Sequence, residues 1–307
     1  MTNTLITGGA GFLGNAWLAQ PGINLGEHYV LSRDETKHEA LKRRYPGVHT
    51  IIGDVRNATV LEPLMQGMDL VIHAAAVKYV DEAEHNVMET IDVNVRGTAA
   101  VLSAAARAGV GTVVVISTDK ATAPLNTYGS TKQLCERMVG EYARRWTNTR
   151  FVACRYGNVV GSTGSVTWKW AHAIERGEPV SVTDGMMTRF WLAPSDAVAV
   201  IRRTMDAMTG TVVIPYAPAM SMRDVATAMG AREIKEIGLR PGERMDEMLL
   251  SDEEAPRAID AGGQIMLRPA YERGRANGIS GYDSSNPKRW LSAADMVAMV
   301  EEARTLW

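Results

Sequence analysis

Short apolar runs rich in β-branched residues alternate with helical patterns along the first half of this chain. The runs lie at 4–7, 29–31, 50–52, 70–72, 112–116 and 150–154, and each has the length and composition of a buried strand. The Ala-rich segment 92–108 is typical of a helix, and Gly109 after it is typical of a helix C-cap. This alternation predicts an α/β protein with a doubly wound parallel sheet.

The alternation loosens after Gly161, where several glycines and a proline interrupt it. We therefore expect a first domain at 1–175, with a return segment at about 190–215, and a smaller lobe at 176–307. The Gly- and Arg-rich stretch 262–281 is expected to be mobile or to cover a substrate. Ser292 and Asp295 form a capping-box pattern that predicts a final helix ending near Trp307.

Composition narrows the class without identifying it. The chain has 307 residues, of which 46% are hydrophobic and 22% charged, as expected for a globular protein with a sizeable core. A net charge of -2 gives no electrostatic reason to bind nucleic acid or an anionic membrane. Two isolated cysteines argue against a disulfide scaffold or structural zinc, so we expect no metal. Without a long apolar run, we expect a cytoplasmic protein.

A Gly-rich loop follows the first predicted strand. Glycines at 8, 11 and 14 have the TGxxGxxG spacing, which permits a tight turn, close approach of the backbone to a pyrophosphate, and close packing of the next helix. The free N–H groups at the start of that helix can bind phosphate. The sequence therefore predicts a Rossmann-type dinucleotide site held by Thr7, Gly8, Gly11, Phe12, Leu13 and Gly14.

The end of the second predicted strand bears on which dinucleotide is bound. An acidic residue there favours NAD and an arginine favours NADP, and this chain has both, in Arg33 and Asp34. We favour NADP because Ser32 and Lys37 flank Arg33, and NAD is the alternative.

Later strand ends add further candidates around the same ligand. Asp54 and Val55 follow the third strand, where a short acid can bind an adenine amino group. Small residues after the fourth strand would let a cofactor lie against the backbone; they are Ala74, Ala75 and Ala76. His73 is expected to be structural. Lys78 is either a site residue or a surface lysine, and Asn94 is expected to brace the backbone near the site.

The richest chemistry follows the strand at 112–116. Ser117, Thr118, Asp119 and Lys120 come directly after it, and Tyr128 and Lys132 follow four residues apart. If Tyr128 opens a helix, the Lys132 ammonium lies beside the phenol, lowers its pKa and makes it a base. The adjacent acid and amine at 119–120 suggest a second acid–base pair, or simply a local ion pair.

Together these motifs resemble the extended short-chain dehydrogenase/reductase group. Within that group, the chain is most similar to the short UDP-N-acetylglucosamine 4,6-dehydratases that invert C5. The resemblance lies in residues 32–35, 52–56, 73–78, 117–121, 155–162, 187–191 and 240–243. The Thr-Asp-Lys-Ala block at 118–121 discriminates best, because sugar 4-epimerases of this fold lack the Asp-Lys pair. The Gly loop Ala-Gly-Phe-Leu-Gly departs from the dehydratase pattern and is closer to epimerases.

The resemblance implies roles for individual residues. Tyr128, with Lys132 and Thr118, would take the proton of the sugar 4-hydroxyl. Lys120 would be the base at C5, which requires a lowered pKa, and Asp119 the acid at C6. Further cofactor contacts would come from Ser117, Tyr156, Gly157, Asn158 and Val159. The UDP-sugar would be bound by Lys78, Asn158, Ser165, Val166, Arg189, Arg240 and Glu243.

Two alternatives remain open at this stage. A UDP-sugar 4-epimerase would share everything except the use of Asp119 and Lys120, and a sensor or scaffold protein would bind NADP without turnover. The family implies a homo-oligomer, either a dimer or a hexamer. The apolar faces of the paired helices would suit an interface or an internal core equally well.

Overall fold

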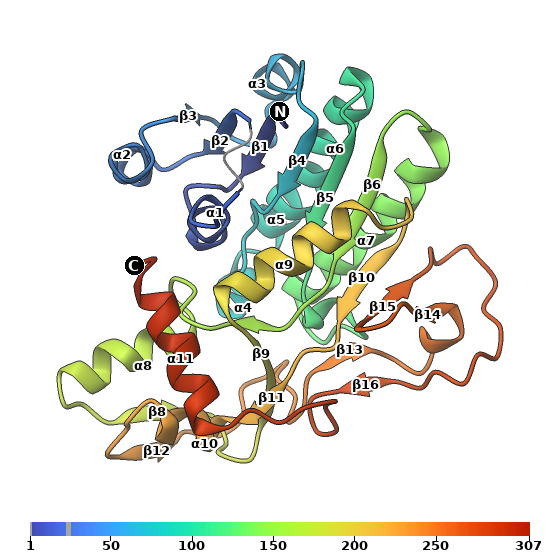
Figure 1. The fold of residues 1–307 in the computed structure, drawn as a ribbon. Coiled ribbons are helices and arrows are strands. Elements are labelled where there is room, and N and C mark those ends of the chain that lie inside the picture. The colour runs from blue at the N-terminus through green and yellow to red at the C-terminus, as the bar shows by residue number, and fades with distance from the viewer. Residues whose placement is uncertain (1, 23–25) are drawn as a thin grey trace.

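The structure, a computed structural model, describes residues 2–22 and 26–307. Within those residues the central sheet has nine strands in the order β14-β15-β10-β6-β5-β4-β1-β2-β3 (Figure 1). Their bounds are β1 Thr4–Thr7, β2 His28–Ser32, β3 Val48–Ile52, β4 Leu70–His73, β5 Thr112–Ile116, β6 Arg150–Cys154, β10 Val212–Pro215, β14 Ala258–Asp260 and β15 Gln264–Leu267. From β3 to β10 neighbouring strands are parallel, and this confirms the predicted doubly wound α/β fold.

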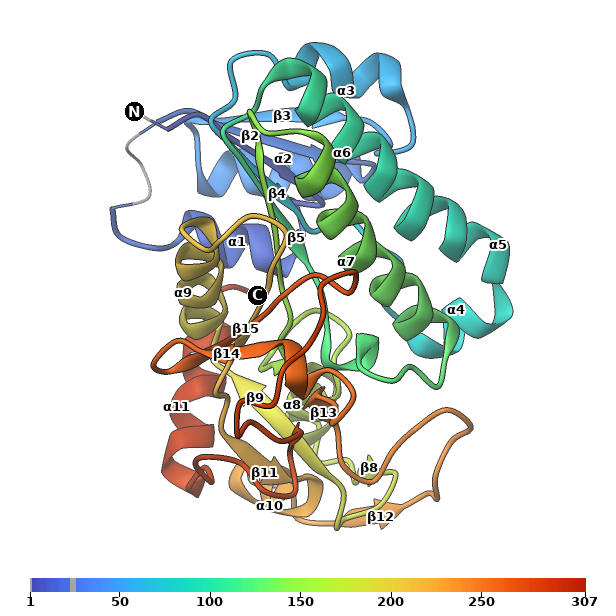
Figure 2. The ribbon, with the colours of Figure 1, turned by 90° about the vertical axis from the view of Figure 1, so that its right-hand side faces the viewer.

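Helices cover both faces of this sheet (Figure 2). On one face lie α3 (Ala58–Leu64), α6 (Gly97–Ala108) and α7 (Thr127–Arg145), and on the other α1 (Phe12–Leu18) and α9 (Pro194–Met205). The remaining helices of this half are α2 (Glu35–Arg44), α4 (Val80–His85) and α5 (Val87–Thr90). Because the central strands are buried on both faces, their near-continuous Val, Ile and Leu content is explained.

The rest of the chain builds a smaller part below the sheet in Figure 1. Its strand groups are β7 (Asn158–Val159), β9 (Thr188–Leu192) and β11 (Ala219–Ser221); β8 (Val180–Val182) with β12 (Ile234–Glu236); and β13 (Met248–Leu250) with β16 (Tyr282–Asp283). Its helices are α8 (Val166–Glu175), α10 (Met222–Ala228) and α11 (Ala293–Arg304). A second apolar cluster fills this part and includes Phe12 from α1, so the Gly-loop helix packs against both parts.

Several predicted elements have the expected bounds. The strands at 4–7, 112–116 and 150–154 are confirmed, and Ser292 caps α11 through the predicted capping box with Asp295. The helix expected at 92–108 begins as a π-helical segment, Ile91–Arg96, and continues as α6, which ends at Gly109 in the left-handed conformation with φ 69°.

The prediction for 262–281 was wrong in part. This stretch contains β15, which pairs antiparallel with both β10 and β14 and extends the central sheet. Pro269 and Tyr271 then pack against Gly140 of α7. Residues 258–267 thus lie beyond residue 175 in the sequence but belong to the sheet of the first half. The division of the chain at 175/176 is therefore not tested by the structure and stays a proposal.

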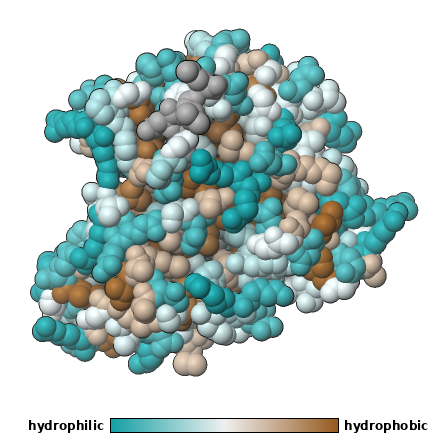
Figure 3. Space-filling view, viewed as in Figure 1, coloured by the Kyte–Doolittle hydropathy of each residue, from teal (hydrophilic) through white to brown (hydrophobic). Residues whose placement is uncertain are grey.

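The surface offers no single dominant apolar area on the face seen in Figure 3, where hydrophobic groups are scattered among hydrophilic ones. Among the helices in the described ranges, none has the length and apolar character required to cross a bilayer.

Candidate active site

The Gly-rich loop after β1 forms a narrow backbone cradle. A Cβ on Gly8, whose φ is 68°, would lie 2.8 Å from Ala75 Cα, and one on Gly14 would lie 1.9 Å from the Gly9 carbonyl oxygen. Only glycine therefore fits at either position. No side chain caps the N-terminus of α1 at Gly11, so the first N–H groups of the helix, at Phe12 and Leu13, remain available to an anionic ligand. This cradle fits the pyrophosphate of a dinucleotide.

A buried histidine joins β1 to β4 beside the cradle. The His73 Nδ1 lies 2.7 Å from Thr7 Oγ1, and its Nε2 lies 2.9 Å from Thr98 Oγ1. Burial lowers the pKa of His73 to about 3, so the ring is neutral. The Ala75 N–H also donates to Thr7 Oγ1. His73 is thus structural, and Thr7 fixes the strand end where 74–76 begin.

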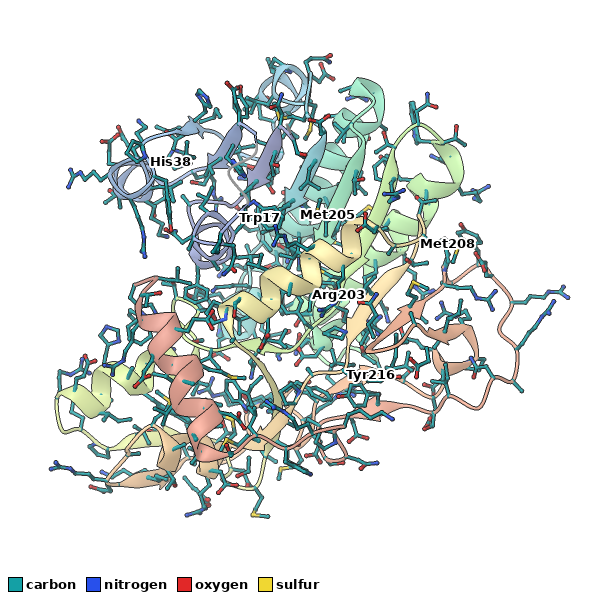
Figure 4. The ribbon with its side chains drawn as sticks, in the orientation of Figure 1. Trp17, His38, Arg203, Met205, Met208 and Tyr216 are labelled. Atoms are coloured by element: carbon teal, nitrogen blue, oxygen red, sulfur yellow. The ribbon has the colours of Figure 1, made fainter. Side chains whose placement is uncertain are left out.

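The polar residues after β2 are only partly engaged. Ser32 Oγ lies 2.6 Å from Nε2 of His38, which is labelled in Figure 4. Lys37 pairs with Asp34 at 3.0 Å, and Asp34 caps α2. Arg33 is exposed, with its Nη1 3.7 Å from Asp54 Oδ2 and 3.8 Å from Glu89 Oε1, both longer than a hydrogen bond. The exposed Arg33 guanidinium can therefore bind a further anionic group.

Asp54 is held by a neighbour. Arg56 donates to both carboxylate oxygens, at 2.9 and 2.6 Å, and these hydrogen bonds lower the Asp54 pKa. Val55 is buried against Gly97 and belongs to the core. The expected contact between Asp54 and adenine stays a prediction.

The loop after β4 reaches toward the smaller part. Asn94 braces it as expected, accepting from the Val77 N–H at 2.8 Å and donating to the Val77 carbonyl at 3.0 Å. Lys78 Nζ donates to the Thr163 carbonyl at 2.9 Å, which tethers the loop ahead of α8. Lys78 therefore lies where the two parts of the chain face each other.

Tyr128 lies in the first turn of α7, whose N-cap is Asn126. Lys132 is one turn further, but its Nζ donates to the Ile116 carbonyl at 2.6 Å. Burial raises the Tyr128 pKa to about 12, against the lowering influence of Lys120 and of a hydrogen bond with Thr118. The expectation that Lys132 lowers the pKa of this phenol is therefore wrong for this structure, because its ammonium is committed to the end of β5.

Asp119 and Lys120 form the 3-10 turn Asp119–Ala121 at the end of β5, and both face a third ionisable group. Lys120 Nζ lies 3.2 Å from Asp119 Oδ1 and 3.1 Å from Glu247 Oε1. Thr118 Oγ1 donates to Asp119 Oδ1 at 2.7 Å. A continuous polar chain thus runs from Glu247 through Lys120 and Asp119 to Thr118, and Lys120 and Thr118 both lower the pKa of the neighbouring Tyr128 phenol.

Charge and burial set the protonation of this group. Burial raises the Asp119 pKa, so its carboxyl tends to keep its proton. Burial lowers the Lys120 pKa, but Asp119 and Glu247 outweigh that influence and raise it. The lowered pKa expected for Lys120 is therefore wrong for this structure, because the acidic side chains of Asp119 and Glu247 surround its amine.

Ser117 is hydrogen-bonded to a buried carboxylate. Its hydroxyl donates to Glu136 Oε1 at 2.6 Å, inside a buried network in which Arg155 binds Glu136 at 2.6 Å and Glu254 at 2.8 Å. This network joins β5, β6, α7 and the segment after β13. The hydroxyl beside the phenol is that of Thr118.

The segment after β6 supports the same region. The Tyr156 carbonyl accepts from the Asp119 N–H at 3.1 Å, and Tyr156 itself is buried. A Cβ on Gly157 would lie 2.7 Å from Phe190 Cβ, so glycine permits β7 to pack on β9. Asn158 and Val159 form β7 and are half-buried.

The predicted UDP contacts are spread over the smaller part. Ser165 caps α8, accepting from the Trp168 N–H at 3.3 Å, and Val166 is the first helical residue. Arg240 is exposed, 3.3 Å from Asp81, and its N–H donates to Glu243 Oε2 at 3.2 Å. Direct contact with UDP stays a prediction for all four.

Arg189 is already engaged within the chain. It is 8% exposed and donates to the carbonyls of Thr188, Met245 and Arg244 at 2.7, 2.9 and 3.0 Å. Its Nε is 3.8 Å from Glu247 Oε1. Arg189 therefore holds the segment that carries Glu247, and its expected contact with a pyrophosphate stays a prediction.

Two residues near Lys120 were missed by sequence reasoning. Glu247 pairs with Lys120, and the Arg244 guanidinium donates to the Ala123 carbonyl. Both follow the 240–243 motif closely, and that proximity was the available signal.

Comparison with known proteins identifies the family. A model described as polysaccharide biosynthesis protein matches residues 4–268. The UDP-N-acetylglucosamine 4,6-dehydratase (inverting) of Campylobacter jejuni subsp. jejuni serotype O:2 is 33% identical, covering 97% of each chain. The UDP-glucose 4-epimerase of Rickettsia akari is 34% identical, covering 97% of this chain and 89% of its own length.

Solved structures agree on the fold. The X-ray structure of Pen from Bacillus thuringiensis has a TM-score of 0.90 and 30% identity, and the match covers 100% of this chain and 98% of that one. DesIV, a dTDP-glucose 4,6-dehydratase from Streptomyces venezuelae, has a TM-score of 0.74 at 21% identity, with 99% and 97% covered, and shows the fold alone. The motifs, the sheet and these relatives agree: the chain belongs to the polysaccharide biosynthesis protein family, with the extended short-chain dehydrogenase/reductase fold that its sequence predicts.

Proposed function

We propose that this protein is a nucleotide-sugar 4,6-dehydratase that converts UDP-N-acetylglucosamine to a UDP-2-acetamido-2,6-dideoxy-4-keto-hexose, with inversion at C5. One observation carries the proposal: a buried acid, Asp119, and a half-buried amine, Lys120, pair with each other beside Thr118 and the Tyr128 phenol. A reductase-type centre needs only the phenol, whereas loss of water needs an additional acid and base. The inverting dehydratase relative supports the same activity.

The cradle at the N-terminus of α1 would hold a nicotinamide dinucleotide, with Gly8, Gly11 and Gly14 against the pyrophosphate. We infer NADP because the exposed Arg33 is only loosely paired and can bind a 2′-phosphate. When bound, this cofactor supplies a hydride acceptor for sugar C4 and a hydride donor for C6.

The side chains would then handle the protons. Tyr128, once it has lost its own proton to solvent, would take the proton of the 4-hydroxyl as the C4 hydride leaves, which makes the 4-ketone and acidifies C5–H. Lys120 removes the C5 proton, and Asp119 gives its proton to the C6 hydroxyl, so the C6–O bond breaks and water leaves. C6 would then take the hydride back, while C5 accepts a proton from solvent on the opposite face. Each such positioned group typically contributes ~10²–10⁴ in rate.

The UDP group would lie between the loop at 240–243 and the start of α8. Arg240 is exposed enough to bind a phosphate, Glu243 can accept from ribose hydroxyls, and the backbone at Ser165 and Val166 begins a helix. Lys78 and Asn158 would complete the contact from the dinucleotide side.

We also propose that the protein forms a homo-oligomer, either a dimer or a hexamer. Leu134 on α7 and Met88 on α5 are 51% and 63% exposed, which is costly for apolar side chains left in water. Light scattering of the purified protein tests this proposal, and a monomer at all concentrations would contradict it.

Incubation with UDP-N-acetylglucosamine and NADP tests the dehydratase. We expect a product lighter by one water, identified by NMR as the 4-keto-6-deoxy sugar, and its formation should fail in Lys120→Ala. A product of unchanged mass would instead identify a UDP-sugar 4-epimerase, which the Rickettsia relative favours. Retained NADP without turnover would identify a sensor or scaffold protein.

The choice of dinucleotide has its own test. In Arg33→Ala we expect the dissociation constant for NADP to rise by about 10-fold or more, since hydrogen bonds to charged groups contribute about 1.5–3 kcal/mol, and that for NAD to change little. Arg43→Ala, on the exposed side of α2, is the matched control. Equal losses for both dinucleotides would argue against NADP preference.

A further inference from the structure

Glu247 comes from the second half of the chain, immediately before β13, yet it completes the cluster at the end of β5. It is 6% exposed, and its Oε1 lies 3.1 Å from Lys120 Nζ. A carboxylate so deeply buried is costly unless it is paired. Lys120 is therefore its principal partner, and the pair belongs to the site although no motif includes Glu247.

Glu247 is held in place from several directions. Its N–H donates to Ser284 Oγ at 2.9 Å, and the Ser284 N–H donates to the Glu247 carbonyl at 2.8 Å. Arg189 Nε lies 3.8 Å from Oε1, while the Arg189 guanidinium holds the carbonyls of Arg244 and Met245. The carboxylate is thus anchored by its own backbone and by β9, independently of Lys120.

We propose that Glu247 is a positioning residue for the dehydration: it fixes the Lys120 ammonium beside Asp119 and sets the pH above which Lys120 becomes the neutral base at C5. This inference rests on the proposed dehydratase function and assigns a role that neither Tyr128 nor the Asp-Lys pair can supply.

Four ionisable groups lie around Lys120, and three of them, Asp119, Glu247 and Arg189, shift its pKa. Asp119 adjoins it in the same turn, Glu247 faces it from the segment before β13, Tyr128 faces it from α7, and Arg189 from β9 opposes its positive charge. Tyr128 is neutral because burial raises its pKa to about 12.

Asp119 and Glu247 differ in their tendency to ionise. Burial raises the Asp119 pKa, whereas for Glu247 attraction to Lys120 and Arg189 outweighs burial and lowers the pKa. Glu247 is therefore the carboxylate whose negative charge retains the proton on Lys120.

The proton balance gives this arrangement a function. Lys120 must be neutral to accept the C5 proton, and acceptance turns it back into an ammonium as the C5–H bond breaks. Glu247 stabilises that ammonium, while Asp119 loses its own proton to the departing C6 hydroxyl. The cost is that Lys120 becomes neutral only at higher pH, so the rate of the C5 step rises with pH.

Glu247→Gln tests the inference. The holoenzyme is incubated with UDP-N-acetylglucosamine in deuterated buffer across about pH 5 to 10, spanning the range in which catalytic bases titrate, and deuterium entering C5 is measured by mass spectrometry and NMR. Without the negative charge, the rising limb of this pH profile should move to lower pH by about 1 unit or more, as expected for loss of an opposite charge within 4–6 Å. Exposed Glu253→Gln, in the segment just after β13, is the matched control and should leave the limb unmoved.

A second variant covers the case in which Glu247→Gln does not fold. Glu247→Asp keeps the negative charge but moves it away from Lys120 by the length of one methylene. The rising limb of its pH profile should therefore also move to lower pH, but by less than in Glu247→Gln. If the folded variants still release a product lighter by one water, but the rising limb stays at the wild-type pH, the inference about Glu247 is overturned. If the wild-type enzyme loses no water at all, it is the proposed function that fails instead.

Discussion

Thr118 donates its hydroxyl hydrogen to Oδ1 of Asp119 at 2.7 Å, and the other carboxyl oxygen, Oδ2, is buried without a hydrogen-bond partner. Oδ1 also accepts from the Lys120 N–H at 2.9 Å and from Lys120 Nζ at 3.2 Å. Burial raises the Asp119 pKa, and since Oδ1 is surrounded by donors, a proton on this carboxyl would lie on Oδ2. Oδ2 is therefore the oxygen that would carry the acidic proton of the Asp119 carboxyl.

Asp119→Asn should therefore uncouple dehydration from oxidation. The amide has the same shape but cannot act as an acid, so we expect formation of the 4-keto-6-deoxy product to fall by about 10²–10⁴-fold. Transient reduction of the nicotinamide should persist, because it needs Tyr128 and not Asp119. Stopped-flow absorbance and product mass measure the two steps, and equal losses in both would contradict the assignment.

The pH dependence of the Asp119 step has a defined sign. An acid must be protonated to act, so the wild-type rate of water loss should fall as pH rises through the raised pKa of Asp119. This limb opposes the rising limb that Lys120 gives to the C5 step, and the two together predict a bell-shaped profile. Asp119→Asn should leave only the low residual rate, without a falling limb.

Gly8→Ala should abolish dinucleotide binding. Its Cβ would lie 2.8 Å from the Ala75 backbone, and φ 68° is unfavourable for alanine, so the loop must move away from the phosphate position. Gly47→Ala is the control, since no atom lies within 4 Å of its added Cβ. Fluorescence titration with NADPH measures binding, and tight binding by Gly8→Ala would contradict the cradle.

Arg155→Ala should be strongly destabilising. Its buried guanidinium binds Glu136 at 2.6 Å and Glu254 at 2.8 Å, so its removal leaves two buried carboxylates without their partner. We expect the free energy of unfolding to fall by about 3–5 kcal/mol. Arg145→Ala removes only an exposed pair with Glu141 and should cost at most about 1 kcal/mol. Urea denaturation compares them, and similar losses would contradict the buried network's importance.

The local sequence pattern was sufficient to predict strands where the chain is uniformly apolar. The strand at 112–116 was predicted with its bounds because five consecutive apolar or β-branched residues have few alternatives. Strand β15 was missed, because its pairing with β10 depends on segments far apart in the sequence and its flanks are rich in Gly and Arg. Strands of this kind are specified by tertiary contacts more than by composition.

The site was predictable to the extent that its residues are close in sequence. The Asp119–Lys120 pair could be recognised from the sequence alone. The charges that act on it could not, because Glu247 is brought to Lys120 only by the packing of β13, β16 and β9. Likewise Lys132 was assigned to Tyr128 by helical spacing, whereas the Ile116 carbonyl at the end of β5 takes its ammonium. Spacing on one helix does not reveal a partner on a neighbouring strand.

His73 should make stability depend on pH in a predictable direction. Burial depresses its pKa to about 3 in the folded state, against 6.5 as the ordinary value. Its contribution to stability is therefore fully present above about pH 6.5, and is lost as pH falls toward 3, because only the unfolded chain binds the proton.

His73→Gln isolates this contribution. The variant should be less stable than wild type at neutral pH, since hydrogen bonds to Thr7 and Thr98 are lost. The difference should narrow by up to about 1.4 kcal/mol per pH unit below pH 6.5, measured by urea denaturation. Exposed His85→Gln should run parallel to wild type at every pH. A gap between His73→Gln and wild type that stays constant down to pH 4 would mean that His73 is charged in the folded protein, and its neutral bridge between β1 and β4 would have to be abandoned.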